Sequence, residues 1–271
     1  MTIENSETFG EEHDDSINER VESDLKKHSS RENFSPAEMM VITARKLADD
    51  GHSPFLAGQI TVRDEDGDTF WTTDLMKNFA EVGYEDLIRF DQQLQIIEGN
   101  SMPNPAVRFH LWIYENRPDI NAIVHTHPPY ASALSMLGEE LVVSHMDAMP
   151  AYDRCAFVPE WPGVPVGNSE GEMISAALGP SNKMALLGHH GIIATGASQA
   201  EALYLAISLE TAARLHMTAS SVGEIKTVDK ALAEEARDFL MQDVVVPATV
   251  DAWGRMVFKQ HADLERESQG N

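Results

Sequence analysis

The segment Ile120–His125 constrains the fold more strongly than any other part of the chain. Its sequence, Ile-Asn-Ala-Ile-Val-His, predicts a strand that is buried in a sheet. Pro118-Asp119 ends the helix predicted before it, and Pro128-Pro129 fixes the path of the chain after it. The remaining elements must therefore form a core around this strand.

Strands and helices follow one another along the chain without a strict repeat. Alternating side chains predict strands at 59–63 and 69–73, joined by the turn 64–68, and further sheet at 87–91, 93–97, 184–187 and 192–195. Helical spacing and helix-start signals predict helices at about 36–50, 105–117, 129–137, 169–178, 198–220 and 228–241, whereas 141–167 is predicted to be irregular loop with short strands. Ser35 with Glu38, and Ser169 with Glu172, have the spacing of a capping box. This mixture predicts one α/β domain with a largely antiparallel sheet.

Composition suggests how the 271 residues are divided. A hydrophobic fraction of 42% with 24% charged residues is ordinary for a globular protein with a substantial core. Residues 1–33 are polar and acidic, which predicts a flexible N-terminal tail. Residues 34–222 are predicted to form the main domain. Residues 223–271 are predicted to form a helical extension that packs on this domain or on a neighbouring subunit through side chains such as Trp253 and Phe258.

The net charge of −24 argues against two classes of partner. A nucleic acid needs basic patches for its phosphates, and an anionic membrane surface would repel this chain. No apolar run approaches the length of a membrane span. The single cysteine, Cys155, excludes an intrachain disulfide, and the first residues lack a signal-peptide pattern. We therefore expect a cytoplasmic protein that acts on a small molecule.

Four histidines make up the chemically most informative pattern. His125 and His127 lie two apart at the end of the buried strand, so their side chains point to the same side. Two imidazoles on one side supply half of a metal site. The pair His189-His190 lies between two glycines and two apolar strands, and only one of the two can easily face the same metal. The residues alone leave open whether these histidines bind metal or are hydrogen-bonded core and turn side chains.

Three segments resemble the class II aldolase/adducin family. They are "AGQITVR" (57–63), "RFHLWIYENRPDINAIVHTHPPYASALS" (108–135) and "MALLGHHGIIATGAS" (184–198), and the similarity covers about 38–217. The resemblance implies a three-layer α/β/α sandwich with a mainly antiparallel, nine-stranded sheet. It also implies a homotetramer with active sites between subunits. The implied divalent metal, zinc first with manganese as the alternative, is held by His125, His127 and His190.

The chain departs from the sugar-phosphate aldolases of that family at three places. Their Ser-Ser-Glu segment, which supplies phosphate ligands and the catalytic acid/base, is Asn104-Pro105-Ala106 here. Their second phosphate loop is Asp74-Leu75 here, and the asparagine of their Gly-Asn signature is Gln59. Alanine cannot transfer a proton, and proline has no backbone donor. We therefore expect no useful cleavage of fuculose, rhamnulose or ribulose phosphates.

Two functions remain open from the sequence. The first is a divalent-metal-dependent carbon–carbon lyase, an aldolase or decarboxylase, that acts on a non-phosphorylated keto or hydroxy acid or an aromatic carboxylate. The second is an adducin-like binding or assembly module without catalysis. For the lyase, the candidate catalytic residues are Tyr130, His145 and Asp147, with Tyr152 and Asp153 as further candidates, and the candidate substrate-binding residues are Gln59, Asn104 and Arg108. Arg108 has a second interpretation, a buried structural ion pair.

Overall fold

An eight-stranded sheet runs through the centre of the computed structural model, which describes residues 20–21, 23–27, 31–52, 55–163 and 168–266. The strands are β1 (Gln59–Arg63), β2 (Thr69–Thr73), β3 (Leu87–Asp91), β4 (Ile96–Glu98), β5 (Ala122–Thr126), β6 (Cys155–Val158), β7 (Met184–Leu187) and β8 (Gly191–Gly196). Their spatial order is β4-β3-β2-β1-β5-β8-β7-β6, and every neighbouring pair is antiparallel except β6 with β7. The predicted, mainly antiparallel sheet is confirmed, with eight strands in the described residues where the resemblance implied nine.

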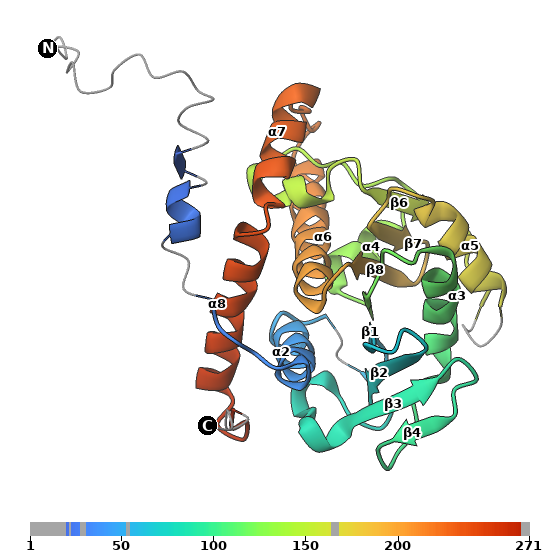
Figure 1. Cartoon of the computed structure of the whole chain (residues 1–271). Helices are drawn as coiled ribbons and strands as arrows, with labels where there is room; N and C mark the ends of the chain where they lie inside the picture. Colours follow the sequence, from blue (N-terminus) through green and yellow to red (C-terminus); the bar gives the residue numbers. More distant parts are fainter. Residues whose placement is uncertain (1–19, 22, 28–30, 53–54, 164–167, 267–271) are drawn as a thin grey trace, which may run out of the picture.

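Helices cover both faces of the sheet (Figure 1). One face carries α2 (Pro36–Asp49), α4 (Pro129–Ser135), α6 (Gln199–Ser220) and α8 (Val245–Gln260), and the other carries α3 (Arg108–Asn116) and α5 (Ser169–Leu178). In β5, Val124 packs into the first core and Ile123 into the second. The sandwich therefore buries both sides of this strand, as its apolar sequence predicts. Among the described residues, no helix combines the length and apolar character that crossing a bilayer requires.

Two local predictions were wrong. The strand predicted at 93–97 begins only at Ile96, because the Asp91 carboxylate accepts hydrogen bonds from the backbone N–H groups of Gln93 and Gln95 and turns the chain. Leu94 has a φ of 62° in this turn. The second predicted capping box is absent: α5 covers the predicted residues 169–178, but Ser169 is already helical and the N-cap, Asn168, makes no side-chain bond. The box of Ser35 and Glu38 on α2 is confirmed.

The C-terminal residues form two helices against the main domain. The helix predicted at 228–241 is α7 (Lys230–Leu240), and α8 follows it and packs on α2 and α6. Phe258 stacks on Phe34 with ring centroids 5.8 Å apart. Much of the predicted N-terminal tail (1–19, 22 and 28–30) lies outside the described residues. The adjoining Arg31 pairs with Asp251 of α8 at 3.1 Å.

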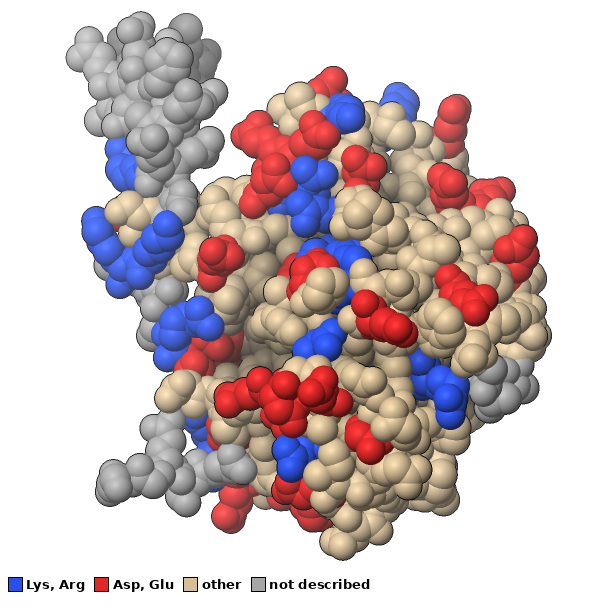
Figure 2. Space-filling view, turned by 45° about the vertical axis from the view of Figure 1, so that its right-hand side comes forward, with Lys and Arg blue, Asp and Glu red and all other residues tan. Residues whose placement is uncertain are grey.

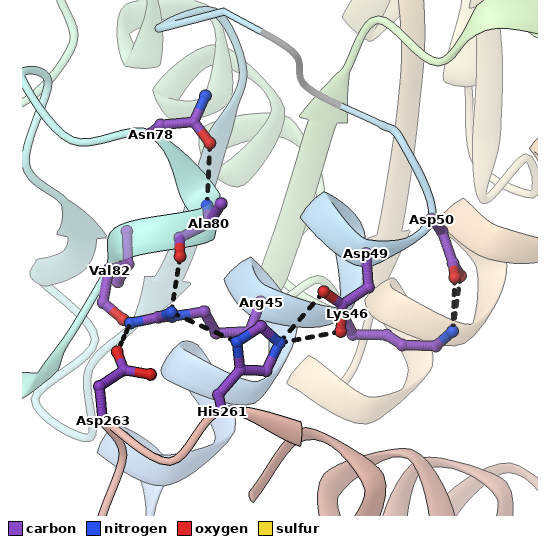
Figure 3. Close-up of polar contacts among 9 residues, drawn as sticks. All are labelled: Arg45, Lys46, Asp49, Asp50, Asn78, Ala80, Val82, His261 and Asp263. Atoms are coloured by element: carbon purple, nitrogen blue, oxygen red, sulfur yellow. Dashed lines mark hydrogen bonds and ion pairs between the residues drawn. The ribbon is translucent and has the colours of Figure 1, made fainter. Parts of the chain in front are cut away.

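A buried arginine ties this C-terminal segment to the domain (Figure 3). Arg45 of α2 is only 4% exposed, and its guanidinium donates to the carbonyl oxygens of Val82 at 2.9 Å and Ala80 at 2.6 Å. Its third nitrogen pairs with Asp263 at 2.5 Å, beyond the end of α8. His261 contacts Asp49 at 3.0 Å beside it. One cation thus holds both the turn after η1 (Phe79–Glu81) and the C-terminal segment.

Replacing this cation should destabilise the whole domain. The change Arg45→Met keeps the length of the side chain but leaves the buried carbonyl group of Val82, and that of Ala80, without their donor. We expect a loss of about 2–4 kcal/mol in the free energy of unfolding, measured from urea denaturation midpoints. The Asp263 carboxylate is 60% exposed, so Asp263→Asn should cost less than about 1 kcal/mol. Equal costs for the two variants would contradict the assignment of Arg45 as the central contact.

Candidate metal centre

Three histidines from strand β5, the residue just after it and a neighbouring turn converge at one end of the sheet. His125 lies in the buried strand β5, His127 follows β5, and His190 lies in the turn that joins β7 to β8. One ring nitrogen of each lies within 4.8 Å of the other two. The Nε2 atoms of His125 and His127 are 3.0 Å apart. The strand alternation that placed the first two on one side is therefore what presents them to the third.

Hydrogen bonds fix which nitrogen each ring directs inward. The Nδ1–H of His125 donates to the carbonyl oxygen of Ile192 at 2.8 Å, which leaves its Nε2 lone pair facing His127. The Nδ1 of His190 is 2.8 Å from Oε1 of Glu170, so its Nε2 is also free. Such outer partners hold imidazole ligands in one tautomer and orientation.

Glu170 is a site residue that the sequence reasoning missed. It lies in the first turn of α5, 20 residues before His190, and is 5% exposed. Its Oε2 atom is buried and has no hydrogen-bond partner among the described groups. A buried carboxylate of this kind is costly unless positive charge lies close to it. The carboxylate therefore suits a cation held by the histidines.

The turn that carries the histidine pair separates its two members. His189 has a φ of 57° and is exposed, whereas His190 points to His125 and His127. The left-handed backbone of this turn residue therefore separates the two side chains. At Gly191, a Cβ atom would lie 2.6 Å from Cδ2 of His127 and would also collide with the Thr126 carbonyl. Glycine therefore lets β8 approach the histidines closely.

The electrostatics of the cluster favour neutral imidazoles. Burial, with a smaller contribution from the neighbouring His190, lowers the pKa of His127 to about 4. Burial and the two adjacent imidazoles hold the pKa of His125 well below its usual value. Neutral rings with unprotonated Nε2 atoms are the form that binds a divalent ion. Three such donors with a buried carboxylate behind them therefore fit a metal, and they leave further coordination positions for other ligands.

The predicted substrate-binding residues fall into two groups. Gln59 pairs in register with His125 across β1 and β5, and its Oε1 is buried without a partner among the described groups. Gln59 and Asn104 line one small hollow, together with Asp74 and Lys77. Arg108 lines a different hollow. It is exposed and forms no ion pair with any described carboxylate, so its interpretation as a buried structural ion pair was wrong.

The predicted catalytic residues lie outside the histidine cluster. Tyr130 is 41% exposed at the start of α4, where its backbone N–H donates to Glu210. The side chains of His145 and Asp147 are 55% and 75% exposed at the start of η4 (Met146–Ala151). Tyr152 and Asp153 follow η4. The described residues place none of these five in hydrogen-bond contact with the three histidines, and their catalytic roles stay predictions.

Known proteins resemble this chain over most of its length. Residues 38–217 match the family model described as Class II Aldolase and Adducin N-terminal domain. "Decarboxylase NovR" of Streptomyces niveus is 29% identical over 181 residues, which is 66% of this chain and 67% of that protein. "L-fuculose phosphate aldolase" of Escherichia coli strain K12 is 30% identical over 193 residues, which is 69% of this chain and 84% of the aldolase.

A solved structure supports the same fold. "L-fuculose 1-phosphate aldolase from Glaciozyma antarctica PI12" superposes with a TM-score of 0.78 at 23% identity, over 90% of this chain and 99% of that one. The named relatives are a decarboxylase and aldolases, which are lyases, and the three histidines of this chain could hold a metal ion. The chain belongs to the class II aldolase and adducin N-terminal domain family.

Proposed function

We propose that the chain is a divalent-metal-dependent carbon–carbon lyase, an aldolase or decarboxylase, for a non-phosphorylated keto or hydroxy acid or an aromatic carboxylate. The convergence of His125, His127 and His190 on one point, with Ala106 in place of the family's catalytic glutamate, carries this proposal. The name of the Streptomyces niveus relative, a decarboxylase, is consistent with it.

The hollow beside the cluster disfavours a phosphate. Asp74 lies in its wall, where its carboxylate accepts hydrogen bonds from the Met76 N–H at 2.8 Å and the Ser101 hydroxyl at 2.6 Å. The one lysine in the wall, Lys77, already pairs with Asp86 at 3.2 Å. The fixed carboxylate would repel a dianionic phosphate, and the lysine, already paired with Asp86, would not offset this repulsion. We therefore place a non-phosphorylated substrate here.

The protein's own groups bind and orient in this proposal. His125, His127 and His190 hold the metal, zinc first and manganese as the alternative, and when bound it supplies a Lewis acid that polarises a substrate oxygen. Gln59 and Asn104 lie at the hollow beside the cluster and bind substrate oxygens through their amides. Glu170 keeps His190 in its tautomer through the bond at 2.8 Å. The proton donor comes from the group of Tyr130, His145 and Asp147.

A combined metal and turnover measurement tests this function. Purified protein is analysed for zinc and manganese and then assayed with aromatic carboxylates, keto acids and hydroxy-keto acids, with carbon dioxide and carbonyl products measured separately. Turnover that requires the metal and disappears in His127→Ala would support the lyase. A metal-loaded protein that turns over only sugar phosphates would refute the substrate class. Bound metal without turnover of any substrate would favour the adducin-like module.

Restoring a carboxylate at position 106 should harm the native reaction. Ala106 is 6% exposed in the short helix η3 (Pro105–Val107) just before α3, and Phe109 one turn later packs edge-on against His125 with centroids 5.1 Å apart. The acid of Ala106→Glu would occupy coordination positions that the substrate uses. We expect turnover of the native substrate to fall by about tenfold, with Ala106→Gln as an uncharged control. A strong rise in Ala106→Glu would instead identify a damaged sugar-phosphate aldolase.

We also expect a homo-oligomer, a tetramer, located in the cytoplasm. The resemblance to the family motivates the tetramer, since family sites are completed between subunits. Light scattering at micromolar concentration should give a mass of about four times the 30.0 kDa of one chain. A mass of a single chain at that concentration would contradict the prediction.

A further inference from the structure

A second hollow lies on the sheet face that carries α3, and it shares no residue with the histidine cluster. Its volume is about 460 Å³, enough for a small organic molecule. Arg108, Leu111, Trp112 and Glu115 line it from one side of α3, and Arg63, Gln93 and Asn168 lie around them. The spacing of the four α3 residues puts them on a single face of the helix. Although Arg108 is a candidate substrate-binding residue of the lyase, it lines this hollow and not the one that Gln59 and Asn104 line.

Arg63 is held rigidly in the wall of this hollow without a carboxylate partner. Its guanidinium donates to the carbonyl oxygens of Gly67 at 3.1 Å and Tyr114 at 2.9 Å. It also lies over the Tyr114 ring, 4.8 Å from the centroid, and 5.6 Å from that of Phe70. Its Nε–H is buried with no acceptor among the described groups. A fixed and uncompensated positive charge of this kind attracts an anion.

Arg108 supplies a second uncompensated positive charge in the same wall. It is exposed and forms no salt bridge with a described residue. This is unusual in a chain with a net charge of −24, whose surface in Figure 2 carries many acidic side chains. Arg89, Arg117 and Arg255 by contrast each pair with an aspartate or glutamate. The two arginines of the hollow are therefore available to a ligand.

The lining defines the chemistry of that ligand. Arg63 meets α3 at the Tyr114 carbonyl, six residues after Arg108, so these two positions on the helix are about 9 Å apart along its axis. Leu111 and Trp112 lie between these two positions of α3 and offer an apolar surface. We propose that this hollow binds a small planar organic dicarboxylate, with one carboxylate on each arginine and its ring against Trp112. Arginine suits this role because its guanidinium binds carboxylates with two parallel hydrogen bonds.

Glu115 provides a control for the effect of charge in this hollow. It lines the same hollow, and no salt bridge joins it to Arg63 or Arg108. Its carboxylate therefore opposes an anionic ligand without being needed to hold either arginine. Removing its charge should strengthen binding, whereas removing the charge of Arg108 should weaken it. A nonspecific effect of charge on a strongly acidic protein would not depend on position in this way.

Calorimetric titration of the full chain, as purified, with benzene-1,4-dicarboxylate tests the proposal. The dissociation constant should rise about tenfold or more in Arg108→Gln and fall in Glu115→Gln. It should stay unchanged in Arg255→Gln, which removes the same charge at a remote ion pair with Glu32. Neutral benzene-1,4-dicarboxamide should not bind measurably.

The same titration of the double variant His125→Ala/His127→Ala distinguishes binding in this hollow from binding at the metal centre. Binding that persists in the double variant supports the proposal, even if the lyase function fails. Binding that disappears there, or that is unchanged in Arg108→Gln, overturns it. A shift of Arg108→Gln to a smaller oligomer also overturns it, because the hollow is then covered by a second copy. Should Arg63→Gln fail to fold, the exposed Arg108 still decides the outcome.

Discussion

The variant His190→Ala should lose its metal while keeping its fold. The ion would have only two imidazole donors left, and the buried carboxylate of Glu170 would lose its partner at 2.8 Å. We expect the metal content to fall from roughly one ion per chain to below about one-tenth of that value. Turnover of the native substrate should fall with it. Elemental analysis after gel filtration, together with circular dichroism, measures the metal and the fold on the same sample.

The neighbouring histidine offers a matched control for this experiment. His189→Ala removes the same side chain one residue earlier, from an exposed position with a φ of 57°. It should retain the full metal content. The assignment of His190 fails if His189→Ala loses the ion with the fold intact, or if His190→Ala binds as much metal as the unchanged protein.

The sequence could predict those parts of the site that depend on local geometry. His125 and His127 share a side because alternation along a strand is a property of the backbone alone. The choice between His189 and His190 could not follow from alternation, since the pair lies in a turn and His189 is left-handed. That choice came from the family resemblance. The structure supports it through the left-handed turn at His189, after which His190 faces His125 and His127.

Other features depend on contacts between distant segments and could not be predicted. From the sequence, Glu170 is predicted only to lie in a helix. Its role as a partner of His190 requires α5 to pack beside the β7–β8 turn. The exposed position of Arg108 depends on the packing around α3. The shortened β4 does have a local signal, because Asp91 followed by polar residues is typical of a side-chain-capped turn. The catalytic candidates rest on residue type alone: four lie in the predicted loop 141–167, where neither spacing nor periodicity fixes a position, and Tyr130 lies at the start of a predicted helix.

The weakening of metal binding in Glu170 variants is expected to be graded. In Glu170→Gln, the amide oxygen can still accept from the His190 Nδ1–H, but the negative charge is lost. In Glu170→Ala, both the charge and the acceptor are lost, and the ring of His190 is free to rotate or change tautomer. We expect metal affinity to fall by about tenfold in the first variant and about a hundredfold in the second. Competition with a chromophoric chelator measures both values.

The metal affinities of a control variant distinguish a role of Glu170 in positioning His190 from a merely structural role. Glu172→Gln removes the same charge from an exposed position two residues later on α5, so it should leave the affinity unchanged. If Glu172→Gln weakens binding as much as Glu170→Gln, only the net charge of the protein matters. If Glu170→Ala binds metal as tightly as the unchanged protein, the bond at 2.8 Å has no part in orienting the ligand. If the carboxylate acts through His190, the loss of metal affinity must instead follow the loss of the hydrogen-bond acceptor for the Nδ1–H. The reason is that His190 presents its Nε2 lone pair to the metal only while its proton is held on Nδ1.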